Sequence, residues 1–244
     1  MGASRVPKNV AAALRKCCPD GVVEAFLTDE SYFHEIRDAL ERDLSKIRGA
    51  TLHWQTPEPE TVPDWDDDWD HDPLPPDDDW QSYHAFFLAP DGKEFRFEDE
   101  TEGFEEPEDP EATECIETTF PGEGWTGCCV GICLAAPVAI INLSSHSRYE
   151  DGSSSMPDVE SWILSDETGE RVDTDRYYLE ALGPKAFQKI EALRSQIAEV
   201  LSKHGIEVLD KSVLDLPAPK LKAGQDVFLE GPLRVRDAFF FRGP

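Results

Sequence analysis

The sequence has few basic residues and no long apolar run. Its 244 residues include 23 Lys and Arg against 51 Asp and Glu, which gives a net charge of −28 at pH 7. A surface this negative repels nucleic acid and anionic membranes, because both are themselves negatively charged. No stretch reaches the roughly 18 apolar residues of a membrane span, and residues 1–10 lack the apolar run of a secretory signal. These absences predict a cytoplasmic protein that contacts neither membrane nor nucleic acid directly and whose natural partner is a basic protein.

The cysteines lack the spacing of a disulfide framework or a zinc site. The six occur as Cys17-Cys18, Cys115, Cys128-Cys129 and Cys133. Adjacent cysteines rarely bridge each other, and a zinc site needs two close pairs that point four ligands at one ion. We therefore expect reduced thiols, several of them buried as small apolar groups, and neither a metal nor a cofactor.

The acidic residues are concentrated in the middle of the chain. Residues 58–117 contain 24 Asp and Glu against two basic residues, whereas residues 1–57 contain eight of each kind. Within this stretch, residues 57–80 consist mainly of Asp, Trp and Pro, with too little aliphatic content to form a core. We predict that residues 57–80 form an acidic surface loop and that residues 99–114 form a second one.

The hydrophobic pattern predicts a single α+β domain over residues 1–244. Apolar residues recur at spacings of three and four in two long amphipathic helices, at residues 29–48 and 184–204. Alternating segments between them predict an antiparallel or mixed sheet built from hairpins and flanked by the two helices, with one hairpin at residues 81–98 and a terminal strand at 233–241.

Residues 122–127, Gly-Glu-Gly-Trp-Thr-Gly, match the G-x-G-x-x-G pattern of dinucleotide-binding proteins. In those proteins the glycines open a helix whose N-terminus holds the pyrophosphate. Here residues 128–132 favour a strand, and Glu123 would place a negative charge against the phosphate. We therefore interpret residues 121–127 as a structural glycine-rich turn.

Three tryptophans stand in the first acidic loop with few aliphatic neighbours. Two interpretations are open: Trp65, Trp69 and Trp80 either fasten the loop to the domain or serve as exposed anchors for a partner. Flanking carboxylates would steer a cationic surface onto such anchors. The predicted partner-binding site comprises Asp64, Trp65, Asp66, Asp67, Asp68, Trp69, Asp70, Asp77, Asp78, Asp79 and Trp80.

The acidic tract with its tryptophans, the glycine-rich residues 122–127 and the terminal residues 233–241 together resemble, in overall character, the immunity proteins of bacterial polymorphic toxin systems. This resemblance implies an acidic, cytosolic, noncatalytic α+β protein that binds and neutralises a basic toxin or effector, such as a nuclease. No functional residue is transferred from the family, because none of the three features is a diagnostic motif.

Three alternatives accompany this hypothesis. A nucleic-acid-mimicking anti-defence protein would present the same surface to a host DNA-binding protein. A cysteine-dependent enzyme would use Cys128 or Cys129 with a nearby histidine, although acidic surroundings raise the pKa of a thiol. An acidic tract can also serve only to keep a protein soluble.

Overall fold

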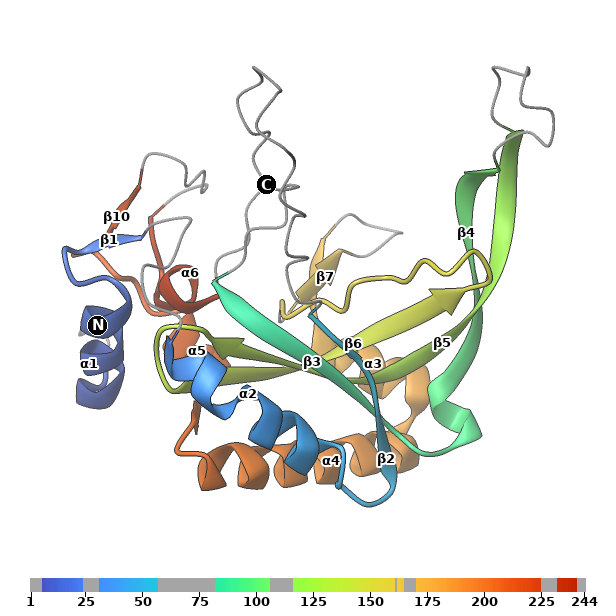
Figure 1. Cartoon of the computed structure of the whole chain (residues 1–244), viewed down its shortest axis with the longest axis horizontal. Coiled ribbons are helices and arrows are strands. Elements are labelled where there is room, and N and C mark those ends of the chain that lie inside the picture. The colour runs from blue at the N-terminus through green and yellow to red at the C-terminus, as the bar shows by residue number, and fades with distance from the viewer. Residues whose placement is uncertain are drawn as a thin grey trace, which may run out of the picture.

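The computed structural model describes residues 6–23, 31–56, 82–105, 116–160, 162–164, 170–224 and 232–240. Within these ranges the protein has an α+β fold, in which a curled, mixed six-stranded sheet carries helices on both faces (Figure 1). The helices are α1 (Lys8–Cys17), α2 (Ser31–Leu44), η1 (Lys93–Phe95), α3 (Thr174–Leu182), α4 (Pro184–Lys203), α5 (Lys211–Leu214) and α6 (Val235–Phe239). The strands are β1 (Val22–Val23), β2 (Ala50–Gln55), β3 (Tyr83–Pro90), β4 (Arg96–Glu105), β5 (Ile116–Cys133), β6 (Val138–Tyr149), β7 (Trp162–Leu164), β8 (Arg171–Asp173), β9 (Glu207–Val208) and β10 (Lys222–Ala223).

The long strand β5 is the centre of the six-stranded sheet. Its residues 116–125 are antiparallel to β4, and its residues 128–133 are antiparallel to β3. On its other edge β5 pairs with β6, to which it is joined by the short connection at residues 134–137. The outer strands are β2, which pairs with β3, and β9, which is parallel to β6. Strand β5 therefore pairs with three other strands, β3, β4 and β6, and fixes their positions in the sheet.

The hairpin predicted over residues 81–98 is wrong. Strands β3 and β4 are both antiparallel to β5, so they run in the same direction, one after the other along one edge of it. The short helix η1 links them and does not reverse the chain. The alternation of apolar and polar residues is the same whether the second strand reverses direction, as in a hairpin, or runs on in the same direction. The sequence, with its turn residues at positions 90–93, could therefore not distinguish these two arrangements.

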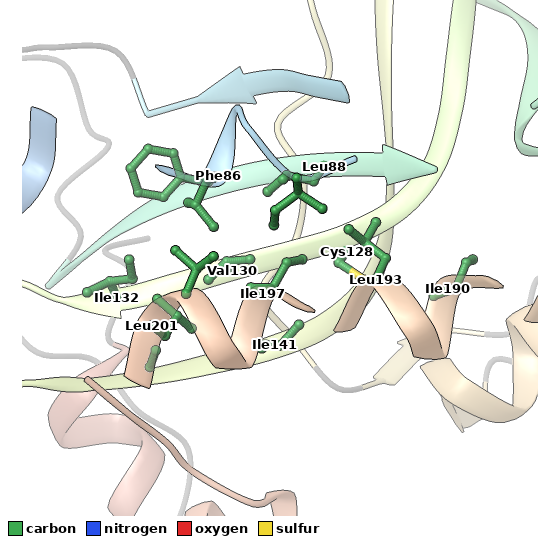
Figure 2. Packing of buried hydrophobic residues seen from close by; sticks show 14 of the residues in the cluster. Phe86, Leu88, Cys128, Val130, Ile132, Ile141, Ile190, Leu193, Ile197 and Leu201 are labelled. Carbon is green, nitrogen blue, oxygen red and sulfur yellow. The ribbon is translucent and has the colours of Figure 1, made fainter. Parts of the chain in front are cut away.

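Helix α4 packs on one face of the sheet together with α2, and the two do not lie on opposite faces. It begins at Pro184, as its sequence predicts. Phe33, Leu40 and Leu44 of α2 belong to the same core and are each at most 2% exposed. Figure 2 labels the following members of this core: Phe86 and Leu88 of β3, Cys128, Val130 and Ile132 of β5, Ile141 of β6, and Ile190, Leu193, Ile197 and Leu201 of α4. In the described part of the chain, no helix combines the length and the apolar character needed to cross a membrane.

The opposite face of the sheet is covered by α1, α5 and α6, which brings segments from both ends of the chain together. Val10 of α1, Leu214 of α5 and Phe239 of α6 belong to one buried cluster on this face. Strands β1 and β10 pair in parallel beside it, with Val22 opposite Lys222 (Figure 1). We call α1, β1, β10 and α6 the terminal unit.

The terminal strand predicted over residues 233–241 is also wrong, because residues 235–239 form α6. Val235, Ala238 and Phe239 are buried at spacings of three and four, which is the period of a helix. The carboxylate of Asp237 accepts a hydrogen bond of 2.6 Å from the backbone N–H of Arg234 and so caps the first turn. The run of aromatic residues has a composition typical of a strand. In a segment this short, however, the cap and the packing of the side chains determine that a helix forms.

Two predicted irregular segments are strand instead. Residues 121–127, predicted as a turn, lie within β5, and residues 99–105, predicted as the start of the second acidic loop, belong to β4. Charge and glycine content suggested loops, but pairing with β5 and β6 outweighs these weak local preferences. The remainder of that predicted loop, residues 106–114, and the first predicted loop, residues 57–80, lie outside the described residues.

Candidate functional site

The predicted partner-binding residues, Asp64 to Trp80, all lie outside the described residues, but the structure places the chain on either side of them. Before them, the backbone N–H of Thr56 donates to the carbonyl oxygen of Ala85, and the N–H of Ala85 donates to Oγ1 of Thr56, both at 2.9 Å. After them, the hydroxyl of Ser82 donates to the carbonyl oxygen of Phe239 at 3.0 Å. The described chain thus leaves β2 beside Ala85 of β3 and resumes at Ser82, one residue before β3.

A second acidic surface lies on β4, in the described part of the chain. Glu98, Glu100 and Glu102 are exposed and occupy alternate positions. Because strand side chains alternate between two faces, these three share one face at a spacing of about 6.8 Å. Glu123 of β5 stands directly opposite Glu98 on the same face. Like charges in this arrangement reduce stability, so packing alone does not favour it.

Two arginines border these glutamates. Arg96 Nη1 lies 3.1 Å from Oε1 of Glu123 in an ion pair with both side chains more than half exposed, and Arg148 of β6 stands opposite Glu123 on the other side. The four glutamates therefore exceed the two arginines by two negative charges. We call Arg96, Glu98, Glu100, Glu102, Glu123 and Arg148 the acidic arm, which lies where β4 and β5 curve away from the helices (Figure 1).

A cluster of aromatic rings adjoins the acidic arm. The ring of Trp125 stacks on that of His53 at a centroid distance of 4.3 Å, and the ring of His146 lies nearly parallel to it at 6.1 Å. The guanidinium of Arg148 lies 5.9 Å from the centre of the Trp125 ring and connects the cluster to the acidic arm. Trp125 is only 8% exposed, so it supports the surface from below and is not itself an exposed anchor.

The histidines of this cluster are neutral at pH 7. Burial, with a further contribution from Arg148, lowers the pKa of His53 to about 4, and burial also lowers the pKa of His146. Nδ1 of His146 lies 2.8 Å from the carbonyl oxygen of Ser155, while Nε2 of His146 and Nε1 of Trp125 are buried and have no hydrogen-bond partner among the described residues. The cluster therefore places an uncharged aromatic layer beside exposed carboxylates.

The glycines of the G-x-G-x-x-G sequence let side chains of β4 and β6 approach each other across β5. A Cβ atom at Gly122 would overlap the ring of Tyr149, and one at Gly124 would overlap the ring of Phe97. The residues that follow continue β5, where a dinucleotide site requires a helix. The motif thus serves strand packing, and the structural interpretation of these glycines holds although they do not form a turn.

Asp99 uses the space left by Gly122 to connect β4 to β6. Its Oδ2 accepts hydrogen bonds from the hydroxyl of Ser147 at 2.6 Å and from that of Tyr149 at 3.0 Å. The Ser147 bond in particular lowers the pKa of Asp99, so this carboxylate remains ionised at neutral pH. The three side chains fix the curvature of the acidic arm from the face opposite the glutamates.

The thiols of Cys128 and Cys129 are unsuited to nucleophilic catalysis. Both side chains are fully buried, and burial raises the pKa of Cys128 to about 12 and that of Cys129 well above its usual value. A cysteine nucleophile needs a lowered pKa and access to substrate. The five described cysteines are all free, and the described ranges contain no group of three or more His, Cys, Asp or Glu arranged to hold a metal ion.

No match was found when the chain was compared with protein-family models, with curated proteins and with solved structures. Its function is therefore inferred from its own surface. The described residues define an α+β protein with an acidic arm beside a largely buried aromatic cluster.

The sequence contains a signal for the acidic arm that the loop prediction overlooked. Glutamates at alternate positions over residues 98–102 fit a strand with one charged face. The pairing of Glu98 with Glu123, however, requires the register between β4 and β5, which no local pattern gives.

Proposed function

We propose that this protein is a noncatalytic cytosolic inhibitor of the immunity type, which binds and neutralises a basic toxin or effector such as a nuclease. The observation that carries this proposal is the local charge, with 24 acidic and two basic residues between positions 58 and 117. Enzymes that act on nucleic acid carry cationic clefts, and carboxylates can occupy such a cleft in place of phosphates. Concentrated negative charge would also accelerate association with such a partner.

The acidic arm supports the proposal from the described residues. Glu98, Glu100 and Glu102 are exposed on a paired strand, so their backbone loses little conformational freedom when a partner binds. We assign the tryptophans of residues 64–80 the role of anchors and the carboxylates of both regions the role of steering. Of these two regions, only residues 64–80 combine charged residues with aromatic residues that have no packing role assigned to them.

The test uses the product of the reading frame next to the gene of this protein, because immunity genes usually lie beside their toxins. Replacement of Asp66, Asp67, Asp68, Asp77, Asp78 and Asp79 by Asn should slow association with this product at least tenfold at about 50 mM salt. It should also flatten the decline of the association rate as salt rises to about 300 mM. Stopped-flow fluorescence measures both effects, and an activity assay of the partner measures inhibition.

A matched control removes exposed acids elsewhere. Asp20→Asn, Glu35→Gln and Glu199→Gln together should leave the association rate nearly unchanged. Glu98→Gln, Glu100→Gln and Glu102→Gln together should give an intermediate rate. Unchanged binding by the six-residue variant would overturn the assignment of residues 64–80, and a neighbouring product that is neither bound nor inhibited would count against the proposed function.

The second candidate is a nucleic-acid-mimicking anti-defence protein, which the regular row of carboxylates on β4 favours. Such a protein would bind a host DNA-binding protein at its DNA site. Duplex DNA should then displace it from that protein in a competition assay, while the product of the neighbouring reading frame would not bind.

A further inference from the structure

Two cysteines that are distant in the sequence meet where the terminal unit contacts the central sheet. The Sγ atoms of Cys17, at the end of α1, and Cys133, at the end of β5, lie 3.5 Å apart although 116 positions separate them. We propose that this pair is a site of reversible oxidation, at which a peroxide closes a disulfide between α1 and β5. The S–S bond of about 2.05 Å requires the sulfurs to approach by about 1.5 Å, which side-chain rotation can supply.

The surroundings of Cys133 stabilise a thiolate, unlike those of the other buried cysteines of β5. The chain turns directly after this residue, and the backbone N–H groups of Ala135 and Ala136 donate to its sulfur. The thiol of Cys17 lies within hydrogen-bond distance of it, and Lys16 adds a positive charge nearby. These contacts lower the pKa of Cys133, while the shared hydrogen bond and burial raise the pKa of Cys17. Cys133 is therefore the better nucleophile of the two, and Cys17 holds its proton more firmly.

The two sulfurs differ in access to solvent. Cys17 is partly exposed, whereas Cys133 is completely buried. A small oxidant therefore reaches Cys17 first, and the proton of its thiol passes to the hydroxide that leaves the peroxide. Cys133 is already in contact with Cys17 and is placed to attack the oxidised sulfur of Cys17.

The chemistry with hydrogen peroxide balances in two steps. In the first, the sulfur of Cys17 attacks one peroxide oxygen and the O–O bond breaks, which gives a sulfenic acid and, with one proton, water. In the second, the sulfur of Cys133 attacks the sulfenic sulfur, the S–S bond forms, and the hydroxyl leaves with a proton as a second water. Two thiols lose two electrons and the peroxide gains them. A reducing cytosol reverses the bond, so it forms only under oxidising conditions.

The disulfide would fasten the terminal unit to the sheet. In the reduced protein α1 is attached through side-chain packing and a few hydrogen bonds. A covalent link that closes a loop this long removes much of the freedom of the unfolded chain. We expect the oxidised protein to melt about 10 °C above the reduced protein.

The experiment oxidises the reduced, folded, full-length protein with an equimolar amount of hydrogen peroxide. The protein is then unfolded in denaturant that contains N-ethylmaleimide, which blocks all free thiols, and the digest is analysed by mass spectrometry. The expected result is a cross-linked peptide pair that contains Cys17 and Cys133, while Cys128 and Cys129 carry the blocking group. Thermal unfolding of the oxidised and reduced proteins measures the change in melting temperature.

Variants distinguish this site from general thiol oxidation. Cys17→Ala and Cys133→Ser should each abolish the cross-link and the rise in melting temperature, whereas Cys18→Ala should retain both. The oxidation site is refuted if the folded wild-type protein forms no such cross-link, or forms it only in denaturant. A cross-link without a rise in melting temperature would refute the fastening of the terminal unit.

Discussion

At the scale of single residues, the buried histidine of β3 shows how burial creates sensitivity to pH. His84 is 7% exposed, and its ring lies 4.7 Å from that of Phe33 and 4.8 Å from that of Phe86. Burial, aided by the charge of Arg37, lowers the pKa of His84 to about 4, and within the described part of the chain its Nε2 atom has no hydrogen-bond partner. The imidazole is therefore held neutral among apolar rings.

Acidification should destabilise the protein through His84. Because the pKa of His84 is about 4 in the folded state and about 6.5 in the unfolded chain, the unfolded chain binds the proton first as pH falls. The contribution of neutral His84 to the free energy of unfolding is fully present above about pH 6.5. It declines as the pH falls toward 4, and the loss from this residue reaches up to about 3 kcal/mol. His84→Phe should reduce this loss, which urea unfolding at pH 7.5 and pH 5 measures.

The remaining pH dependence of that variant should come from His53 and His146, whose pKa values are also lowered. His34→Gln is the comparison variant, because His34 is exposed but its charge helps to lower the pKa of His84. This variant should lose slightly less stability at pH 5 than the wild-type protein and more than His84→Phe. Equal losses in all three proteins would contradict the role of His84.

At the scale of elements, the place where β5 changes partners depends on a glycine. Gly127 lies between the part of β5 that pairs with β4 and the part that pairs with β3. A Cβ atom at this position would overlap the carbonyl oxygen of Leu88 and lie 2.8 Å from the Cα of Ala89. These are backbone atoms of a paired strand, so they cannot move aside cheaply.

We expect Gly127→Ala to lower the free energy of unfolding by about 1–3 kcal/mol, the usual range for overpacking. Gly103→Ala on β4 is the matched control, because its new methyl group would meet only the ring of Phe120, a partly exposed side chain that can rotate. Urea unfolding of both variants gives the comparison. Equal stability of the two variants would show that β3 and β5 separate more easily than their packing suggests.

The same element shows what the sequence can and cannot predict. The helix from Pro184 follows from its own apolar spacing, β3 is visible as a segment rich in Tyr, His and Phe, and the start of β4 is visible as an alternating segment. That both pair with one strand depends on residues of β5 that lie 11 to 50 positions further along the chain, and local patterns do not contain this information. The acidic arm depends on this pairing, so local patterns cannot predict it either. Residues 64–80, in contrast, can be recognised by composition alone.

At the scale of the whole molecule, the net charge of −28 opposes the compact state through self-repulsion. Partly buried ion pairs such as Arg194 with Asp175, at 2.5 Å, offset only part of this repulsion, and exposed pairs contribute little. Added salt should screen the repulsion and raise the free energy of unfolding by about 1 kcal/mol between roughly 20 and 500 mM sodium chloride.

Urea unfolding at the two salt concentrations measures this effect. The variant with six Asp→Asn replacements should show a smaller increase, because it carries less charge to screen. Salt would thus strengthen the fold while it weakens the proposed association with a basic partner. A decrease in stability with salt would mean that attractive ion pairs outweigh the repulsion.

The terminal unit also bears on how the protein is made. A ribosome synthesises β1 long before its partner β10 and the neighbouring helix α6. Val23 and Cys18 pack against Ala238, so their apolar side chains have no native neighbour there while the intervening chain is being produced. This segment of the nascent protein thus docks only after β10 and α6 have been made, and until then it offers apolar surface to chaperones.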